Sequence, residues 1–164
     1  MARTTAMAGT SGETLTVNIN EKLTINGRDY GGQQTMTFAS IVDVYRRLVT
    51  VLHTAESVIA TFAATIGPGG FIAADIRYMR LTNVDDTNFI TLTFRNQDND
   101  EAAIKLDAGQ SFVWNGDNAN GMTAVLNATE DADAASSTNF GSLTNIQADA
   151  DTASCDLEMF LVSV

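Results

Sequence analysis

Alternation of apolar and polar residues is the main pattern in the first third of the chain. Between residues 15 and 25, Leu15, Val17, Ile19, Leu23 and Ile25 are separated by polar residues. Successive side chains of a strand point to opposite faces, so this period of two predicts half-buried β-strands. The Asn-Gly pair at 26–27 and the Gly-Gly pair at 31–32 are typical of tight turns.

The run "TMTFASIVDVYRRLVTVL", residues 35–52, has two possible interpretations. Ile41, Val44, Tyr45 and Leu48 fit helical spacing, which leaves one helix as the alternative. The many β-branched residues and the alternation at 36–38 favour strands. We therefore predict two strands that meet near residues 45–47.

The clearest strands follow the turn "GPGG" at residues 67–70. Most of these runs place their apolar side chains alternately along the strand, and the last run, "DLEMFLVSV", is apolar on both faces and so predicts a central strand. The side chains that these runs bring together are Met79 and Leu81, with Ile76, Tyr78 and Arg80 opposite; Ile90, Leu92 and Phe94; Ile104 and Leu106; Phe112 and Trp114; and Met122, Ala124 and Leu126.

Two segments show no strand pattern. Residues 1–12 are small and polar, which predicts a flexible N-terminal arm. Residues 128–155 are small and acidic, and a structureless loop of that length is unusual in a compact domain. We expect Phe140, Leu143 and Ile146 to hold this long insertion against the body or against a neighbouring subunit.

Short strands separated by regular turn signals predict an all-β protein. We expect an antiparallel, jelly-roll-like β-sandwich that forms one domain from residue 13 to residue 164. The arm at residues 1–12 and the long acidic loop would be its two irregular parts.

The net charge of −11 and the pI near 4.2 argue against direct binding of nucleic acid, which depends on Lys and Arg displacing counterions. No apolar run is long enough to span a membrane. The N-terminus lacks the apolar segment of a secretory signal. We expect a soluble protein made in the cytoplasm, without nucleic-acid or membrane partners.

The acidic segments are the first candidates for a metal site. Asn96, Asp98 and Asp100 alternate as in the start of a calcium loop, but Glu101 stands where that loop needs glycine. We interpret residues 96–101 as a solvated turn, with calcium as the alternative. Residues 85–88, "DDTN", predict a tighter turn whose side chains hydrogen-bond their own backbone.

Catalytic constellations are weak. Paired carboxylates need a shared or buried site to separate their pKa values, and these acids lie in polar turns. His53 is the only histidine and is expected at a strand end, while Cys155, the only cysteine, is expected to be a buried apolar residue. "GPGGF" lacks the lysine of a phosphate-binding loop. We expect no enzyme, no cofactor and no bound metal.

The basic and aromatic residues suggest binding surfaces instead. Two basic pairs could serve as interface anchors or as intramolecular ion pairs. Trp114 and Tyr78 could form a sugar-stacking platform, although core packing is favoured for Trp114. The interface candidates are Arg46, Arg47, Arg77, Arg80, Phe140 and Leu143.

The stretch "IRYMRLTNVDDTNFITLTFRNQDNDEAAIKLDAGQSFVW", together with "DLEMFLVSV", resembles virion structural proteins of tailed bacteriophages, especially marine and cyanobacterial phages. The resemblance covers about 40 residues and the closing strand. It implies a non-enzymatic β-sandwich protein of the capsid cement or decoration type. Such a protein would be located in the virion, be assembled in the host cytoplasm, and bind the major capsid protein or other virion subunits, with a homotrimer favoured.

Two alternatives remain open on the sequence. One is a tail-tube, head-tail adaptor or baseplate subunit, since an acidic wall also suits the passage of DNA. The other is a carbohydrate-binding sandwich or a receptor-binding tip.

Overall fold

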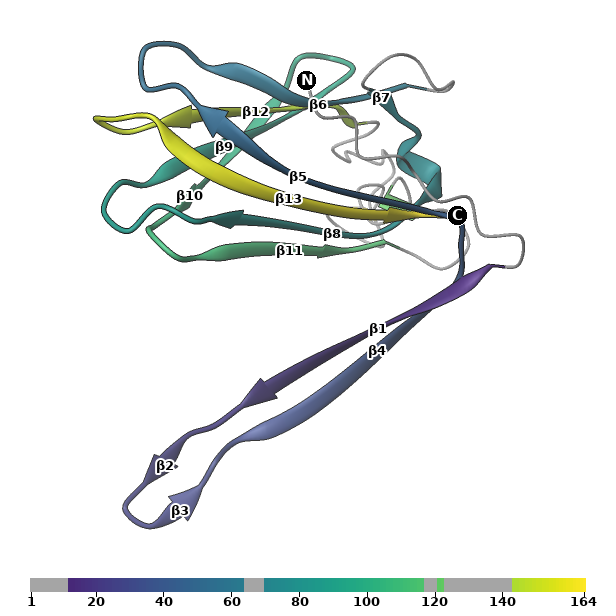
Figure 1. Cartoon of the computed structure of the whole chain (residues 1–164), viewed down its shortest axis with the longest axis vertical. Helices are drawn as coiled ribbons and strands as arrows, with labels where there is room; N and C mark the ends of the chain where they lie inside the picture. Colours follow the sequence, from purple (N-terminus) through teal and green to yellow (C-terminus); the bar gives the residue numbers. More distant parts are fainter. Residues whose placement is uncertain (1–11, 64–69, 117–120, 123–142) are drawn as a thin grey trace, which may run out of the picture.

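The computed structural model describes residues 12–63, 70–116, 121–122 and 143–164, and most of them lie in β-strands (Figure 1). Two sheets form a sandwich, and a long hairpin projects from one end of it. The antiparallel all-β sandwich expected from the alternation of residues is therefore confirmed. The strands are β1 (Glu13–Glu21), β2 (Thr24–Ile25), β3 (Arg28–Asp29), β4 (Gly32–Ile41), β5 (Asp43–Val51), β6 (Ser57–Phe62), β7 (Gly70–Phe71), β8 (Ile76–Asn83), β9 (Ile90–Asn96), β10 (Glu101–Leu106), β11 (Ser111–Asn115), β12 (Leu143–Ala150) and β13 (Cys155–Ser163), with a short 3-10 helix, η1 (Ala73–Asp75), before β8.

The two sheets have a nested strand order. One sheet runs β10-β9-β12-β6-β7 and the other runs β11-β8-β13-β5. The pairs β5/β13, β6/β12, β8/β11 and β9/β10 therefore enclose one another along the sequence, and successive pairs alternate between the sheets. A long antiparallel ribbon folded over on itself gives this connectivity. Strands far apart in sequence thus become neighbours in space.

The core lies between the two sheets. Leu92 of β9 and Met159 of β13 are completely buried, and alternating positions of both strands contribute to a core to which β5, β6, β8, β10 and β12 also contribute. Burial of each large apolar side chain stabilises the fold by about 1.5–3 kcal/mol. Strand β13 lies between β8 and β5, so the prediction of a central strand is confirmed.

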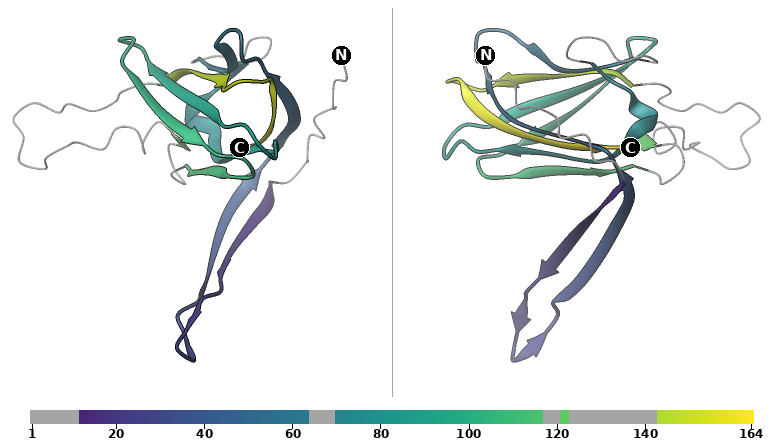
Figure 2. Two further views of the ribbon diagram at one scale, coloured as in Figure 1. Left: turned by 90° about the vertical axis from the view of Figure 1, so that its left-hand side faces the viewer. Right: turned by 45° about the vertical axis from the view of Figure 1, so that its right-hand side comes forward.

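The hairpin of β1 and β4 leaves the sandwich at the end where the C-terminus lies and extends far from it (Figures 1 and 2). The two strands pair in register from Leu15↔Phe38 to Glu21↔Gly32. The register shifts by one residue near the root, where Ser40 has a φ of 61°. Such a bulge bends and twists a ribbon, which explains why the hairpin changes direction here.

The tip of the hairpin is closed by the predicted turn. Asn26 and Gly27 have φ values of 50° and 76°, as a two-residue turn of type I′ requires. Strands β2 and β3 flank this turn. At Gly31, a Cβ atom would lie 2.3 Å from the carbonyl oxygen of Glu21, so only glycine fits. The Asn-Gly and Gly-Gly signals in the sequence therefore mark the two bends of the tip.

Three sequence-based expectations differ from the structure. The segment at residues 35–52 forms two strands as predicted, but they meet at Val42 and not near residues 45–47. The insertion at residues 128–155 contains strand β12, because Leu143, Ile146 and their neighbours pair between β6 and β9. Residues 13–41 form the projecting hairpin, so the sandwich itself begins at β5. The predicted arm at residues 1–12 lies outside the described residues except for Gly12.

Within the described ranges, no helix is both long enough and apolar enough to cross a membrane.

Candidate interaction surface

The outer half of the hairpin, residues 19–34, gathers several exposed apolar side chains, and we call it the ribbon tip. Four large apolar side chains there are 40–59% exposed, although each lies on or beside a paired strand. In the sandwich, the inward-facing positions are buried between the sheets, and the exposed apolar side chains, such as Leu48, lie on its outer surface. The exposed side chains are Ile19, Leu23, Ile25 and Tyr30.

The root of the hairpin is held by a second, small apolar cluster. Phe38 and Ile41 of β4 are buried against Tyr78 of β8 and Val162 of β13. The rings of Phe38 and Tyr78 lie 5.9 Å apart. Tyr78 therefore faces the hairpin and not the main core. This cluster fixes the direction in which the hairpin leaves the sandwich.

We call the projecting hairpin, residues 13–41, the ribbon. Beyond its root, the ribbon is held mainly by the backbone hydrogen bonds between β1 and β4. Its second face is polar, and there Thr35 donates a hydrogen bond to Asn18 across the strands at 2.8 Å. An isolated two-stranded hairpin is marginally stable in water. Both of its outer edges also present unpaired backbone groups to solvent, which is how sheet edges recruit further strands.

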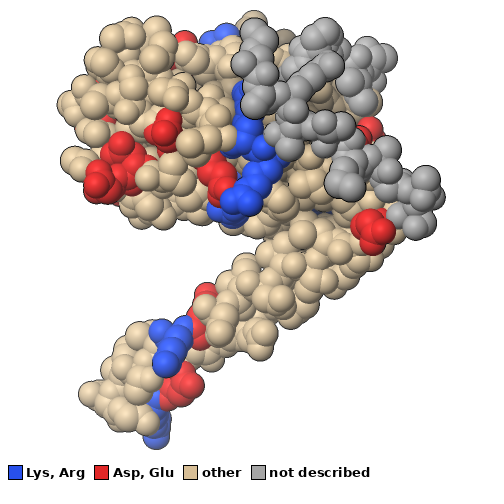
Figure 3. All heavy atoms as spheres, viewed as in Figure 1, with Lys and Arg blue, Asp and Glu red and all other residues tan. Residues whose placement is uncertain are grey.

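Charge separates the ribbon from the sandwich. Residues 1–42 hold three basic residues and three acidic residues, so the whole net charge of −11 falls on residues 43–164. Figure 3 shows the shaft of the hairpin largely free of charged groups, with blue and red atoms gathered near its tip. A neutral arm can approach a strongly acidic neighbour without the repulsion that two such bodies exert on each other. The six charged residues are Arg3, Lys22, Arg28, Glu13, Glu21 and Asp29.

The predicted anchors Arg46 and Arg80 form intramolecular ion pairs on the outer face of the four-stranded sheet. Both contact Glu158 of β13, at 2.5 Å and 2.8 Å. The hydrogen bond from Arg46, followed by that from Arg80, holds the pKa of Glu158 below its ordinary value. These arginines neutralise a carboxylate of their own chain, which was the alternative left open by the sequence.

The remaining anchor candidates are not brought together. Arg47 donates to the backbone oxygen of Ile59 at 3.0 Å, and Arg77 donates to that of Ala74 at 2.7 Å. Leu143 is 3% exposed and packs in the main core, because it lies in β12 between the two sheets. Phe140 lies outside the described residues.

The acids of the turn at residues 85–88 serve the backbone. The Asp85 carboxylate accepts hydrogen bonds from the backbone N–H groups of Thr87 and Asn88 at 2.9 and 2.7 Å. These bonds, that from Asn88 first, lower the pKa of Asp85. The prediction of a turn closed by its own side chains is confirmed.

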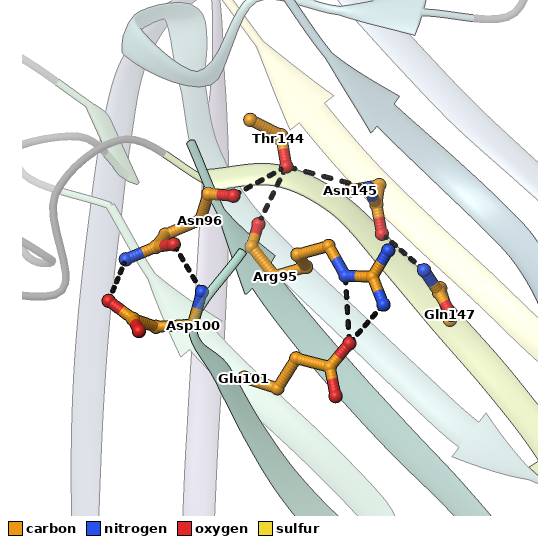
Figure 4. Close-up of polar contacts among 7 residues, drawn as sticks. All are labelled: Arg95, Asn96, Asp100, Glu101, Thr144, Asn145 and Gln147. Atoms are coloured by element: carbon orange, nitrogen blue, oxygen red, sulfur yellow. Dashed lines mark hydrogen bonds and ion pairs between the residues drawn. The ribbon is translucent and has the colours of Figure 1, made fainter. Parts of the chain in front are cut away.

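The turn at residues 96–101 follows the same principle (Figure 4). The Asn96 side-chain oxygen accepts from the backbone N–H groups of Asp98 and Asp100 at 2.9 and 2.8 Å, and its amide donates to the Asp100 carboxylate at 3.1 Å. Glu101 pairs with Arg95. Asn96 is 2% exposed, so its oxygen faces the turn. The alternating acids thus lie in a self-bonded turn, as interpreted from the sequence.

The described residues contain no group of three or more His, Cys, Asp or Glu side chains placed to hold a metal ion. His53 lies just after β5, where its ring contacts the Ser154 hydroxyl at 3.3 Å. Cys155 is 1% exposed, and burial, with nearby carboxylates, raises the pKa of its thiol. Both residues have the structural roles that the sequence predicted.

The two aromatic residues proposed for sugar stacking lie on opposite sides of one sheet. Tyr78 is 5% exposed and faces the hairpin root. Trp114 is partly buried and packs against the main core, with its ring 5.5 Å from that of Phe94. The core role favoured for Trp114 is confirmed, and the two rings form no common platform.

An apolar pocket opens at the end of the sandwich from which the hairpin departs, and we call it the root pocket. Tyr45 of β5 and Phe71 of β7 meet edge to face in it, with ring centres 5.1 Å apart. Asp43 and Asp75 lie among its lining residues, as does Ile76 at the start of β8. The sequence gave no signal for this pocket, because its residues come from four separate segments.

No protein-family model, curated protein or solved structure matches this chain. The ribbon tip and the root pocket therefore have to be interpreted from their own chemistry.

Proposed function

We propose that this protein is a non-enzymatic structural component of a tailed-phage virion, most specifically a capsid cement or decoration protein. In this role it binds the outer shell and stabilises contacts between capsomers. Two features support the proposal. Residues 76–114 resemble phage virion proteins, and a long hairpin projects from the sandwich.

The projecting ribbon is the observation that carries the proposal. A stable sandwich presents a neutral two-stranded arm whose tip exposes four large apolar side chains. Clusters of exposed apolar side chains, unlike single ones, can mark interaction sites. An arm with open strand edges can add to the sheet of a neighbouring subunit. The sandwich then acts as the rigid base of a clamp.

The nested strand pairs support the same role. We interpret them as a jelly roll, an architecture that occurs in viral capsid proteins as well as in lectins and other proteins. Its turns are closed by Asp85 and Asn96. The edge strands β7, β10 and β11 are short, whereas β5 at the remaining edge has nine residues and is a further place where a neighbouring strand could pair.

The decisive experiment is co-sedimentation with expanded capsids of the encoding phage, prepared without this protein. We expect stoichiometric binding and a higher melting temperature of the capsid. A matched variant replaces residues 22–31 with Asn-Gly, which closes the Glu21↔Gly32 pair with a two-residue turn. This variant should keep the sandwich and lose the binding. Absence of binding by the unmodified protein would refute the cement role.

A tail-tube, adaptor or baseplate subunit is the second candidate, and the length of the ribbon also supports it. Rings of subunits can be joined by long arms that reach the next ring. Negative-stain microscopy of the purified protein separates the two roles. Rings or tubes would favour a tail subunit, whereas compact small oligomers would favour a cement protein.

Carbohydrate binding is the weakest candidate, because Tyr78 and Trp114 are each packed within the protein. Strong binding to sugars on a glycan array would support this third candidate.

A further inference from the structure

The root pocket has the size and chemistry of a side-chain receptor. Its volume is about 220 Å³, below the range of roughly 300–1,000 Å³ that is usual for drug-sized ligands. Tyr45 and Phe71 supply an aromatic wall, and Leu161 supplies an aliphatic one. The pocket therefore suits one or two apolar side chains of a protein segment.

The rim of the root pocket is acidic. Asp43 is exposed and Asp75 is partly exposed, and both lie among the lining residues. Among the described residues, neither carboxylate accepts a hydrogen bond or forms an ion pair. Any segment that fills the pocket gains if it places positive charge beside its apolar side chains.

The ribbon tip has the matching combination. Lys22 and Arg28 flank Leu23 and Ile25, and Tyr30 follows two residues later. Within the described part of the chain, these two cations have no ion pair, whereas Arg46, Arg80, Arg95 and Lys105 of the sandwich each have one. Arg47 and Arg77 donate to backbone oxygens. The cations available for a partner are thus at the tip.

A tip cannot fill the pocket of its own chain. The ribbon leaves the sandwich beside the root pocket and stays paired as far as Glu21↔Gly32. At about 3.3 Å per residue, the Glu21↔Gly32 pair lies roughly 25 Å from the root of the hairpin, and the tip lies beyond that pair. Figures 1 and 2 show the tip directed away from the sandwich. Occupation of the pocket by a tip therefore requires a second copy.

We infer that the ribbon tip of one copy docks in the root pocket of another copy of this chain. Leu23, Ile25 and Tyr30 supply the apolar contact, while Lys22 and Arg28 face Asp43 and Asp75. The inference rests on the proposed role of the ribbon as an assembly arm, and it names the partner of its tip. Because tip and pocket are different surfaces, the contact closes either reciprocally in a pair or head to tail in a ring.

Charge reversal tests this contact in the full-length protein. Light scattering coupled to size exclusion, at a series of protein concentrations, gives the mass of the oligomer and its dissociation constant. The tip variant Lys22→Glu/Arg28→Glu and the pocket variant Asp43→Lys/Asp75→Lys should each weaken self-association by about tenfold or more, which corresponds to about 1.4 kcal/mol. The four substitutions combined in one chain should restore it.

The control is Glu56→Lys, an exposed acid just before β6, in the turn at the opposite end of β5 from the pocket. Glu56→Lys changes the net charge by the same amount as Asp43→Lys or Asp75→Lys alone, and it should leave self-association unchanged. Circular dichroism and thermal melting show whether each variant is folded. Restoration by the fourfold variant also proves that the separate substitutions act on one contact.

The outcomes separate this inference from the proposed function. A protein that remains monomeric at every concentration but binds capsids would overturn the tip-in-pocket contact and leave the cement role standing. An oligomer that is weakened by charge reversal at the tip and at the pocket, but that binds no capsid, would support the tip-in-pocket contact and refute the cement role. An oligomer unaffected by either reversal would also overturn the inference.

Discussion

The ribbon and the sandwich have the same alternation of residues but opposite environments. Leu92 in β9 is completely buried, whereas Ile25 in the ribbon tip is 49% exposed. Both residues belong to antiparallel strands with polar neighbours on either side. A period of two therefore predicts the strand, but it does not say whether a second layer covers the apolar face. In the sandwich that layer belongs to the same chain, and for the ribbon tip we propose that another copy provides it.

The largest effect should come from the sandwich. Leu92→Ala removes a fully buried side chain between the sheets and should lower the free energy of unfolding by about 3–5 kcal/mol. Urea denaturation followed by tryptophan fluorescence measures this change. A loss below about 1 kcal/mol would mean that the layer facing Leu92 is far looser than the structure shows.

The root of the hairpin should give an intermediate effect. Phe38→Ala removes a ring from the small cluster with Tyr78 and Val162 and should cost about 2 kcal/mol, because this site can relax more than the main core. Hydrogen exchange should accelerate in residues 13–41 and stay unchanged in β9. Equal acceleration in both regions would show that ribbon and sandwich unfold together.

A smaller effect is expected at Glu158, which joins β5, β13 and β8 through Arg46 and Arg80. The pKa of Glu158 is lowered in the folded protein, so its stabilisation is present above the ordinary value of 4.5 and is lost as the pH falls through the folded-state pKa. Glu158→Gln should cost about 0.5–1 kcal/mol at pH 7.

In acid below pH 4.5, this difference between Glu158→Gln and the unmodified protein should shrink. Chemical denaturation at several pH values measures it. Glu101→Gln provides the matched control, because the Glu101 carboxylate pairs with Arg95 but is 43% exposed, against 18% for Glu158. If the loss of stability caused by Glu158→Gln does not depend on pH, the effect comes from packing and not from the charge of Glu158.

The smallest effect should come from the ribbon tip. Ile25→Ser should change the stability of the dilute protein by no more than about 0.5 kcal/mol, since exposed substitutions seldom do more. Thermal melting at low protein concentration measures this change. If the loss exceeds about 1 kcal/mol, the tip is already packed in the dilute protein and the contrast between the two regions fails.

Much of the sandwich was predictable from the sequence. The strands around Leu92 and Met159 have an unambiguous alternation or a continuous apolar run, and the turns at residues 85–88 and 96–101 have residues that bond their own backbone. These features depend on neighbours in the sequence. Local physical chemistry is sufficient to identify them.

Features that depend on distant residues were missed or misplaced. Strand β12 lies in a stretch of small and polar residues, and it becomes a strand because β6 and β9 pair with both of its edges. The boundary at Val42 is set where the hairpin leaves the sandwich, and no residue signal marks it. The polar second face of the ribbon, with Asn18 and Thr35, was the one sign that these strands are not covered.

The nested pairing also sets an order of events during synthesis. Arg46 and Glu158, which meet across β5 and β13, are 112 residues apart in the sequence, so the four-stranded sheet must wait until β13 has been synthesised. The ribbon closes through the nearby Asn-Gly turn and needs few other residues. Local hairpins form much faster than long-range sheets. On a ribosome, the arm would therefore be complete while the body that carries it, including the pocket residue Leu161, is still unfinished.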